Sequence, residues 1–232
     1  MTERGRRARW SGPLLLAMGL TTPLAACGGN PPPPSAPDAL PGSPPELEEA
    51  LLTTSELGEG WIDLGAVPLE ERGLRGCPEG QVITAGEDAA RRGEAQSTYA
   101  EGKPPAPTFG ESVSLWESAD VASKRLATFA SMASECRSFE EELLDGRRAV
   151  ISVVQRNAPP LGDEAVALEL RADAAEGPTV SSDVVLVRLG SVLVLTEGQR
   201  VDGDPDVSLD QERLDELTGR AVEKAEETLA PS

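Results

Sequence analysis

DVVLVRLGSVLVLT, residues 183–196, consists of two runs of aliphatic and β-branched residues separated by Gly190 and Ser191. Such runs are typical of β-strands, and glycine at the first position of a two-residue connection favours a type II′ hairpin turn. These runs are the most apolar part of the chain after its first 27 residues. The sequence therefore predicts a hairpin that forms the centre of a β-sheet.

Further strands are indicated by periodicity and composition. Residues 109–117 and 165–170 alternate apolar and polar side chains, as half-buried strands do. Residues 149–155 are rich in β-branched side chains, which favour strands. We place another strand near residues 96–100. The rest of residues 62–108 is rich in Gly, Glu, Arg and Pro and predicts long loops.

Two long helices complete the pattern. Ser118 is a typical N-cap for a helix over residues 119–136, in which apolar residues recur at steps of three and four and form one face. A second helix, over residues 208–229, opens with the Ser-x-x-Gln spacing of a capping box. The sequence therefore predicts an α+β fold, an antiparallel sheet with both long helices packed on one face.

The N-terminus has the features of a bacterial lipoprotein signal. Four arginines precede the apolar run 13–20, which is too short to span a membrane. The sequence Leu-Ala-Ala-Cys at 24–27 then provides small residues before a cysteine. We expect residues 1–26 to be a signal peptide and Cys27 to be lipidated, because two or more acyl chains anchor a protein firmly to a membrane. An ordinary secretory signal that happens to end near a cysteine is the alternative.

The segment after the signal is rich in proline. We interpret residues 27–45 as the lipidated cysteine and an extended tether, because proline favours polyproline II structure. At about 3.1 Å per residue this tether reaches roughly 55 Å. A proline-rich recognition motif is the alternative. Residues 46–232 are then enough for one domain.

Composition argues against several classes of function. The chain has a formal net charge of −19, and residues 1–26 carry four Arg and one Glu, or +3, so the remaining residues carry −22. Such an acidic surface repels nucleic acid and anionic lipid headgroups. Histidine, the commonest general base and metal ligand, is absent. We therefore expect no enzyme activity, catalytic residue, cofactor, metal site or nucleic-acid partner.

Two cysteines remain after Cys27. In an oxidising compartment we expect Cys77 and Cys136 to form a disulfide. Such a bridge closes a loop of about 60 residues and contributes roughly 4 kcal/mol in the chain-entropy model. It requires that the two Cα atoms lie within about 7 Å of each other. Two free thiols are the alternative, but the apolar helix face that contains Cys136 favours a structural bridge.

Short motifs in a fixed order resemble the PknH-like sensor-domain family. The sequence LLTTSELGEGW at 51–61 is similar to the opening of these domains, and Cys77, a strand with Trp116, a helix ending at Cys136 and LGDEA at 161–165 follow in order. The family comprises extracytoplasmic domains of actinobacterial Ser/Thr kinases and also free lipoproteins. Its members often have two disulfides, whereas this chain has cysteines for one, so a second bridge is not implied.

The resemblance implies a function without catalysis. We expect a lipoprotein of the cell membrane, carrying acyl groups such as palmitate on Cys27 and facing the outside of the cytoplasm. Its domain would act as a sensor that binds an unidentified ligand or protein of the cell envelope. A protein–protein interaction module without a small-molecule pocket is the alternative, and a hydrolase is a third hypothesis.

Three charged motifs are candidates for chemistry, and each also has a simpler interpretation. Residues 163–164 (Asp-Glu) could be half of a carboxylate pair, but their position indicates a turn. Residues 202–206 (DGDPD) resemble the start of a calcium loop, but Val207 and Arg213 occupy positions that such a loop reserves for Gly and Glu. Residues 147–148 (Arg-Arg) could bind an anion, or could pair with acidic residues at 140–142 and 145.

Overall fold

The computed structural model describes residues 45–66, 76–77, 89–103, 106–142, 147–175 and 177–229. All of them belong to one compact unit, Asp38–Ser232. The predictions for the signal peptide and for Cys27 lie outside the described residues, as do those for the tether before Pro45 and for Asp145.

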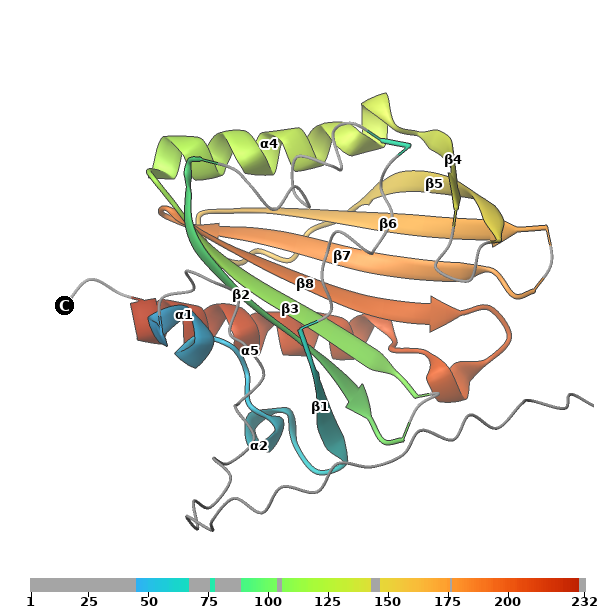
Figure 1. Cartoon of the computed structure of the whole chain (residues 1–232), viewed down its shortest axis with the longest axis horizontal. Helices are drawn as coiled ribbons and strands as arrows, with labels where there is room; N and C mark the ends of the chain where they lie inside the picture. The colour runs from blue at the N-terminus through green and yellow to red at the C-terminus, as the bar shows by residue number, and fades with distance from the viewer. Residues whose placement is uncertain are drawn as a thin grey trace, which may run out of the picture. The chain divides into compact units, whose positions relative to one another are not determined.

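The described strands form one eight-stranded antiparallel sheet in the order β1-β2-β3-β8-β7-β6-β5-β4 (Figure 1). The strands are β1 (Trp61–Gly65), β2 (Arg91–Glu101), β3 (Thr108–Trp116), β4 (Ser138–Glu142), β5 (Arg148–Arg156), β6 (Glu164–Ala174), β7 (Val180–Leu189) and β8 (Val192–Val201). The helices are α1 (Pro45–Glu49), α2 (Thr54–Leu57), α4 (Ala119–Glu135), α5 (Gln211–Leu229) and the 3-10 helix η2 (Pro205–Val207). The predicted α+β class with an antiparallel sheet is confirmed.

The predicted hairpin lies at the centre of this sheet. Strands β7 and β8 pair directly, with Val187 opposite Val194, and Gly190 in the connecting turn has a φ of 59°. Residues 184–187 and 192–195 are all buried. Both faces of the hairpin are therefore covered, which explains why its sequence is continuously apolar rather than alternating.

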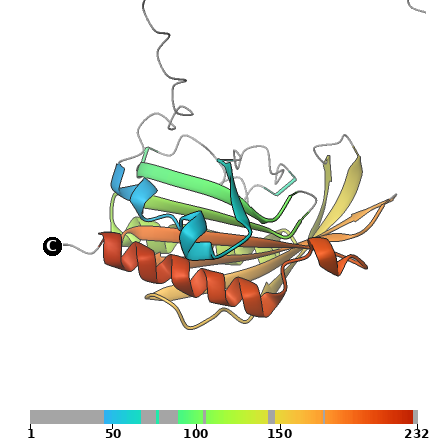
Figure 2. The same cartoon turned by 90° about the horizontal axis from the view of Figure 1, so that it is seen from below.

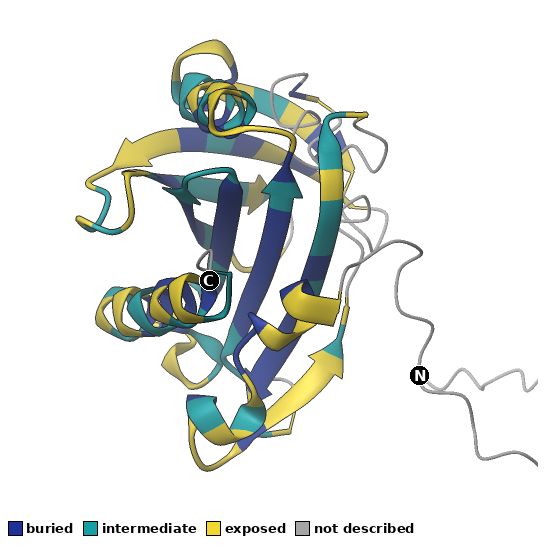
Figure 3. Cartoon of the chain, turned by 90° about the vertical axis from the view of Figure 1, so that its left-hand side faces the viewer, coloured by how far each residue is buried: buried dark blue, intermediate teal, exposed yellow. Residues whose placement is uncertain are grey.

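The two long helices cover opposite faces of the sheet, so the prediction that they share one face is wrong. Val185 and Val187 belong to the cluster that contains the apolar side chains of α5, whereas Val184 and Leu186 belong to the cluster with those of α4. Neighbouring residues of a strand point to opposite faces. In Figure 3 both helices have buried inner sides and exposed outer sides. Each apolar face of the central strands thus has its own helix.

The helix starts agree with prediction in one case and differ in the other. Helix α4 begins after Ser118, whose side chain accepts a hydrogen bond from the Val121 N–H, as predicted. The predicted capping box of α5 is wrong, because Asp210 Oδ1 accepts from the Arg213 N–H at 2.8 Å. Ser208 Oγ instead accepts from the Val201 N–H at 2.9 Å. Helix α5 therefore begins at Gln211, three residues later than predicted.

The start of the described chain forms two short helices, α1 and α2, before strand β1. Helix α1 ends at Glu49, and Thr53 and Glu56 form a capping box for α2. Residues 45–57 are called the N-terminal segment below. It lies on the same side of the sheet as α5 (Figure 2), and Leu47, Ala50 and Leu52 belong to the α5 cluster.

Candidate functional site

Helix α5 packs against β3, β7 and β8, so no helix of the described residues packs on the β5–β6 part of the same face. Four charged side chains lie in a row that crosses this face of the sheet from β5 to β8: Arg156, Glu169, Asp183 and Arg200. Glu169 is directly opposite Asp183 in the strand pairing, and Asp183 is on the same face as Val185 of the α5 cluster. The four residues, called the charged row below, come from β5, β6, β7 and β8.

Each carboxylate of the charged row is paired with at least one guanidinium group. Arg200 Nε donates to Asp183 Oδ2 at 2.7 Å, and Arg200 Nη2 lies 3.4 Å from Glu169 Oε1. Arg156 Nη1 donates to Glu169 Oε2 on the other side. The row thus contains two positive and two negative charges, and its side chains neutralise one another.

The two carboxylates of the row are shielded and the two guanidinium groups are more accessible. The side chains of Asp183 and Glu169 are 5% and 15% exposed, against 34% and 43% for Arg200 and Arg156. Asp183 Oδ1 and Arg200 Nη2 are buried and have no hydrogen-bond partner among the described residues. The guanidinium groups are therefore the members of the row that are more accessible to its surroundings.

Two exposed valines adjoin the charged row. Val150 and Val154 are 46% and 53% exposed, and they alternate along β5 with the same period as Arg156, so they share its face. Val154 is directly opposite Glu169 in β6. Val150, Val154 and the charged row together are called the open face below.

A second cluster lies on the other side of α5, where the N-terminal segment meets the sheet. Glu111 of β3 is 3% exposed, and its Oε2 accepts from the Leu52 N–H at 3.0 Å. The Tyr99 hydroxyl donates to the carbonyl oxygen of the same residue, Leu52. Burial raises the pKa of Glu111 to about 7, because desolvation disfavours the charged carboxylate more than the Leu52 N–H and Lys224 favour it.

The other oxygen of Glu111, Oε1, is buried and has no hydrogen-bond partner among the described residues. The two hydroxyl residues directly opposite Glu111, Ser97 in β2 and Thr196 in β8, are committed elsewhere. Ser97 Oγ donates to Asp63 Oδ1 at 2.6 Å, and Thr196 Oγ1 lies 2.7 Å from Thr218 Oγ1, its partner on α5. The carboxyl group of Glu111 thus receives a single hydrogen bond.

Glu56 of the N-terminal segment has an environment of the opposite kind. Its carboxylate bonds to Lys224 Nζ of α5 at 2.5 Å and also accepts from Thr53. Burial raises the pKa of Glu56, but these hydrogen bonds outweigh it and lower the pKa to about 2. At a pH between these two pKa values, Glu56 is therefore ionised, whereas Glu111 is largely protonated.

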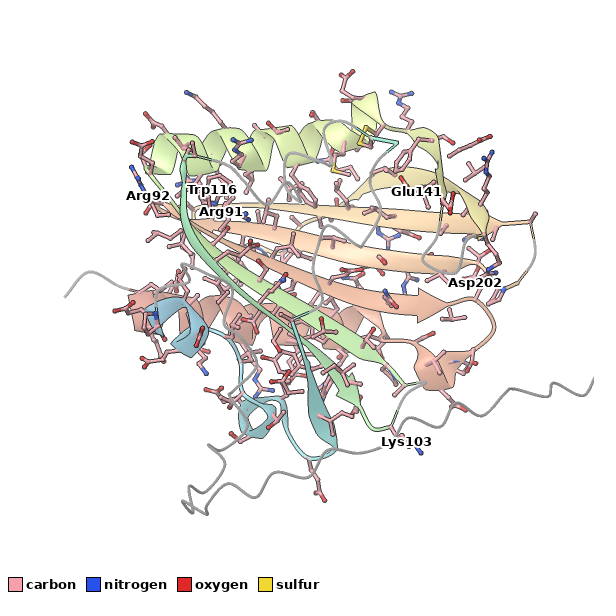
Figure 4. All side chains as sticks on the ribbon, viewed as in Figure 1. Arg91, Arg92, Lys103, Trp116, Glu141 and Asp202 are labelled. Atoms are coloured by element: carbon pink, nitrogen blue, oxygen red, sulfur yellow. A yellow bond between two sulfur atoms is a disulfide. The ribbon has the colours of Figure 1, made fainter. Side chains whose placement is uncertain are left out.

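The predicted cysteine pair is joined in the structure. Cys77 and Cys136 form a disulfide with Cα atoms 5.6 Å apart, within the limit set above. Figure 4 shows the bond near Glu141 at the C-terminal end of α4. Glu141 Oε2 also accepts from the Gly76 N–H at 2.9 Å. Residues 76–77 are thus attached at the β4 edge of the sheet.

The three charged motifs of the sequence have structural partners. Asp163 accepts from Arg188 Nη1 at 2.9 Å and from the Gly190 N–H at 2.8 Å, which agrees with a turn. Asp202 accepts from Arg171 Nη2 at 3.1 Å, and the described residues contain no group of three potential metal-ligating side chains. Arg148 is directly opposite Glu142, while Arg147 lies against Gly177. The structure does not bring these motifs together into one site.

Neither the open face nor Glu111 was predicted as a site. The row residues are far apart in the sequence, and their proximity depends on the register of β5 to β8. Glu111 had a sequence signal, since it is a charged residue between Gly110 and the predicted buried position Val113 in β3. A glutamate within a central strand is rarely fully buried unless it is paired.

The fold has known counterparts among solved structures. The extracellular domain of PknH from Mycobacterium tuberculosis matches with a TM-score of 0.55 and 12% identity, over 78% of this chain and 95% of that domain. An Rv0999 ortholog from Mycobacterium smegmatis matches with a TM-score of 0.46 and 15% identity, over 80% and 98%. No family model and no curated protein sequence matches the chain. Among the described residues no helix is long and apolar enough to cross a membrane. The likeness to the PknH extracellular domain shows that this chain shares the fold of that domain.

Proposed function

We propose that this protein is a lipid-anchored, non-catalytic sensor domain that binds a ligand of the cell envelope outside the cytoplasm. The observation that carries the proposal is the fold match to the extracellular domain of PknH, over 95% of that domain. The lipoprotein signal that ends at Cys27 supports the anchor and the compartment. The likeness of this chain to an extracellular domain supports a binding role.

The open face is the proposed ligand site. Exposed apolar side chains next to accessible donors suit a ligand with an apolar part and hydrogen-bond acceptors. Val150 and Val154 supply the apolar contact, while Arg156 and Arg200 supply donors whose charge is already neutralised by Glu169 and Asp183. Because the charges of the row cancel, we expect the ligand to be bound by hydrogen bonds rather than by attraction to a net charge.

Native mass spectrometry tests the proposal. Residues 30–232, purified from the secreted fraction of an actinobacterial host, should carry extra mass that is released on denaturation. Replacing both Val150 and Val154 by Ser should reduce the bound fraction at least tenfold. The matched control replaces Ile62 and Leu64 of β1, which are similarly exposed at 41% and 44%, and should leave the bound fraction unchanged. A bare wild-type chain in this experiment would refute ligand binding.

The same valines favour a second candidate, an interaction module for an envelope protein. Exposed apolar patches often mark protein interfaces. In this case the chain itself carries no ligand, and crosslinking in living cells should join it to a partner protein. Substitution of Val150 and Val154 should abolish the crosslinked product, whereas substitution of Ile62 and Leu64 should not.

A further inference from the structure

The polar attachment of the N-terminal segment to the sheet centres on one residue, Leu52. Leu52 donates its N–H to Glu111 and accepts at its carbonyl from Tyr99, so two neighbouring strands hold both of its backbone groups. Leu47, Ala50 and Leu57 of the segment are at most 1% exposed. Removing the segment would therefore expose this apolar surface and also Glu111 beneath Leu52.

Glu111 is poorly suited to carry a charge while the segment is attached. Its Oε1 has no hydrogen-bond partner in the described part of the chain, and a buried carboxylate with one hydrogen bond is costly. A neutral carboxylic acid still accepts from the Leu52 N–H through Oε2, so protonation keeps the attachment intact. The N-terminal segment is therefore attached more tightly when the carboxyl group of Glu111 is neutral.

The charged and titratable groups around Glu111 do not reverse this preference. On α5, Lys224 favours the carboxylate, but it is bonded to Glu56 of α2, which disfavours it. On β2, Tyr99 is neutral because burial raises its pKa further above its usual value of 10. On β1, Asp63 accepts a hydrogen bond from Ser97.

We propose that protonation of Glu111 controls how tightly the N-terminal segment is attached to the sheet, so that the segment loosens as the pH rises through neutrality. The proposal does not depend on ligand binding at the open face. It concerns the junction between the domain and the Pro-rich sequence that follows Cys27. A detached segment of 13 residues would extend the reach of that sequence by up to about 45 Å.

Proton linkage gives the direction and size of the effect. In the attached state burial raises the pKa of Glu111 to about 7, and in the detached, hydrated state the pKa returns to 4.5. Attachment is then strongest below pH 4.5, weakens as the pH rises from 4.5 to about 7, and stays weak above that pH. Between these limits the attachment constant should fall by about 300-fold, because each unit of difference between the two pKa values changes the constant tenfold.

Hydrogen exchange of the full-length protein in detergent micelles tests the proposal between pH 5 and pH 8. After correction for intrinsic exchange, the equilibrium constant for opening of residues 46–57 should rise by about two orders of magnitude from pH 5 to pH 8. Residues 184–195 of the central hairpin serve as the reporter of global unfolding and should open less than residues 46–57 at every pH. Equal opening of both regions would overturn the proposal, because the segment would then not detach separately.

Three variants separate protonation from simple loss of contact. Glu111→Gln keeps an oxygen for the Leu52 N–H and should abolish the pH dependence over residues 46–57. Glu48→Gln, an exposed glutamate of the same segment, should leave it unchanged. Tyr99→Phe should increase opening by a similar factor at every pH while keeping the pH dependence. A pH dependence that persists in Glu111→Gln, or one absent from the wild type, would overturn the proposal.

Discussion

Replacement of Gly162 by alanine should destabilise the protein far more than the same replacement at Gly190. Both glycines have a φ of 59°, so both substitutions place a side chain in the left-handed region, which costs about 1 kcal/mol. A Cβ on Gly190 meets nothing within 4 Å. A Cβ on Gly162 would lie 2.6 Å from the carbonyl oxygen of Arg188 and 2.7 Å from Val187 Cγ1.

The additional cost at Gly162 follows from what surrounds it. Relief of the contact requires residues 161–163 to shift away from β7, where the Asp163 N–H donates to the Arg188 carbonyl oxygen at 2.8 Å. Overpacking of this kind costs about 1–3 kcal/mol, so the total for Gly162→Ala is about 2–4 kcal/mol against about 1 kcal/mol for Gly190→Ala.

Urea denaturation at pH 7 measures the difference between these two variants. With a slope of about 2 kcal/mol per molar urea, Gly162→Ala should lower the midpoint by about 1–2 M and Gly190→Ala by about 0.5 M. Equal midpoints for the two variants would refute the reasoning, because backbone conformation alone would then explain both.

Three further predictions follow from particular contacts. Reduction of the Cys77–Cys136 bridge, with a sequence separation of 59, should lower the free energy of unfolding by about 4 kcal/mol; an unchanged urea midpoint under reductant would contradict this. Glu56→Gln should lower stability at neutral pH, and the difference from wild type should vanish as the pH falls from 4.5 to about 2, because the lowered pKa of Glu56 stabilises its ionised form in the fold. Leu217→Ala, at a fully buried side chain, should cost about 2–5 kcal/mol in thermal or urea unfolding, and a loss below 1 kcal/mol would contradict its core position.

The class of fold followed from local sequence, because strand and helix periodicity are properties of neighbouring residues. The hairpin over residues 183–196 and the N-cap at Ser118 were both predicted for this reason. The placement of both long helices on one face was wrong although the sequence contained a counter-signal. A continuously apolar hairpin has two apolar faces, and each of them needs a cover.

The candidate sites were not predicted, because they depend on contacts between distant residues. Glu111 and Leu52 are 59 residues apart in the chain, and the alternation of β3 gave no reason to connect them. The charged row requires three strand registers to be correct at once, and a shift by one residue would move a side chain to the other face. Short edge strands such as β1 and β4 also lack enough residues for a clear period.

Helix α5 lies between the open face and the N-terminal segment, and this position predicts a coupling between them. Near its start, the side chains of Leu209 and Leu214 lie over Gly198, which is directly opposite Asp183 of the charged row. Further along, Lys224 bonds to Glu56 of the segment. A ligand that moves α5 at the open face should therefore change the opening of residues 46–57, and detachment of the segment should change ligand affinity by the same factor.

The exchange experiment above, repeated with and without the ligand found by native mass spectrometry, measures this coupling. Glu56→Gln removes the charge that joins the segment to α5, so it should reduce the effect of ligand on residues 46–57 more than it reduces ligand binding itself. The exposed control Glu48→Gln should leave both quantities unchanged. Ligand binding that leaves the opening of residues 46–57 unaltered in the wild type would show that α5 stays fixed, because a rigid helix with no second position transmits no coupling.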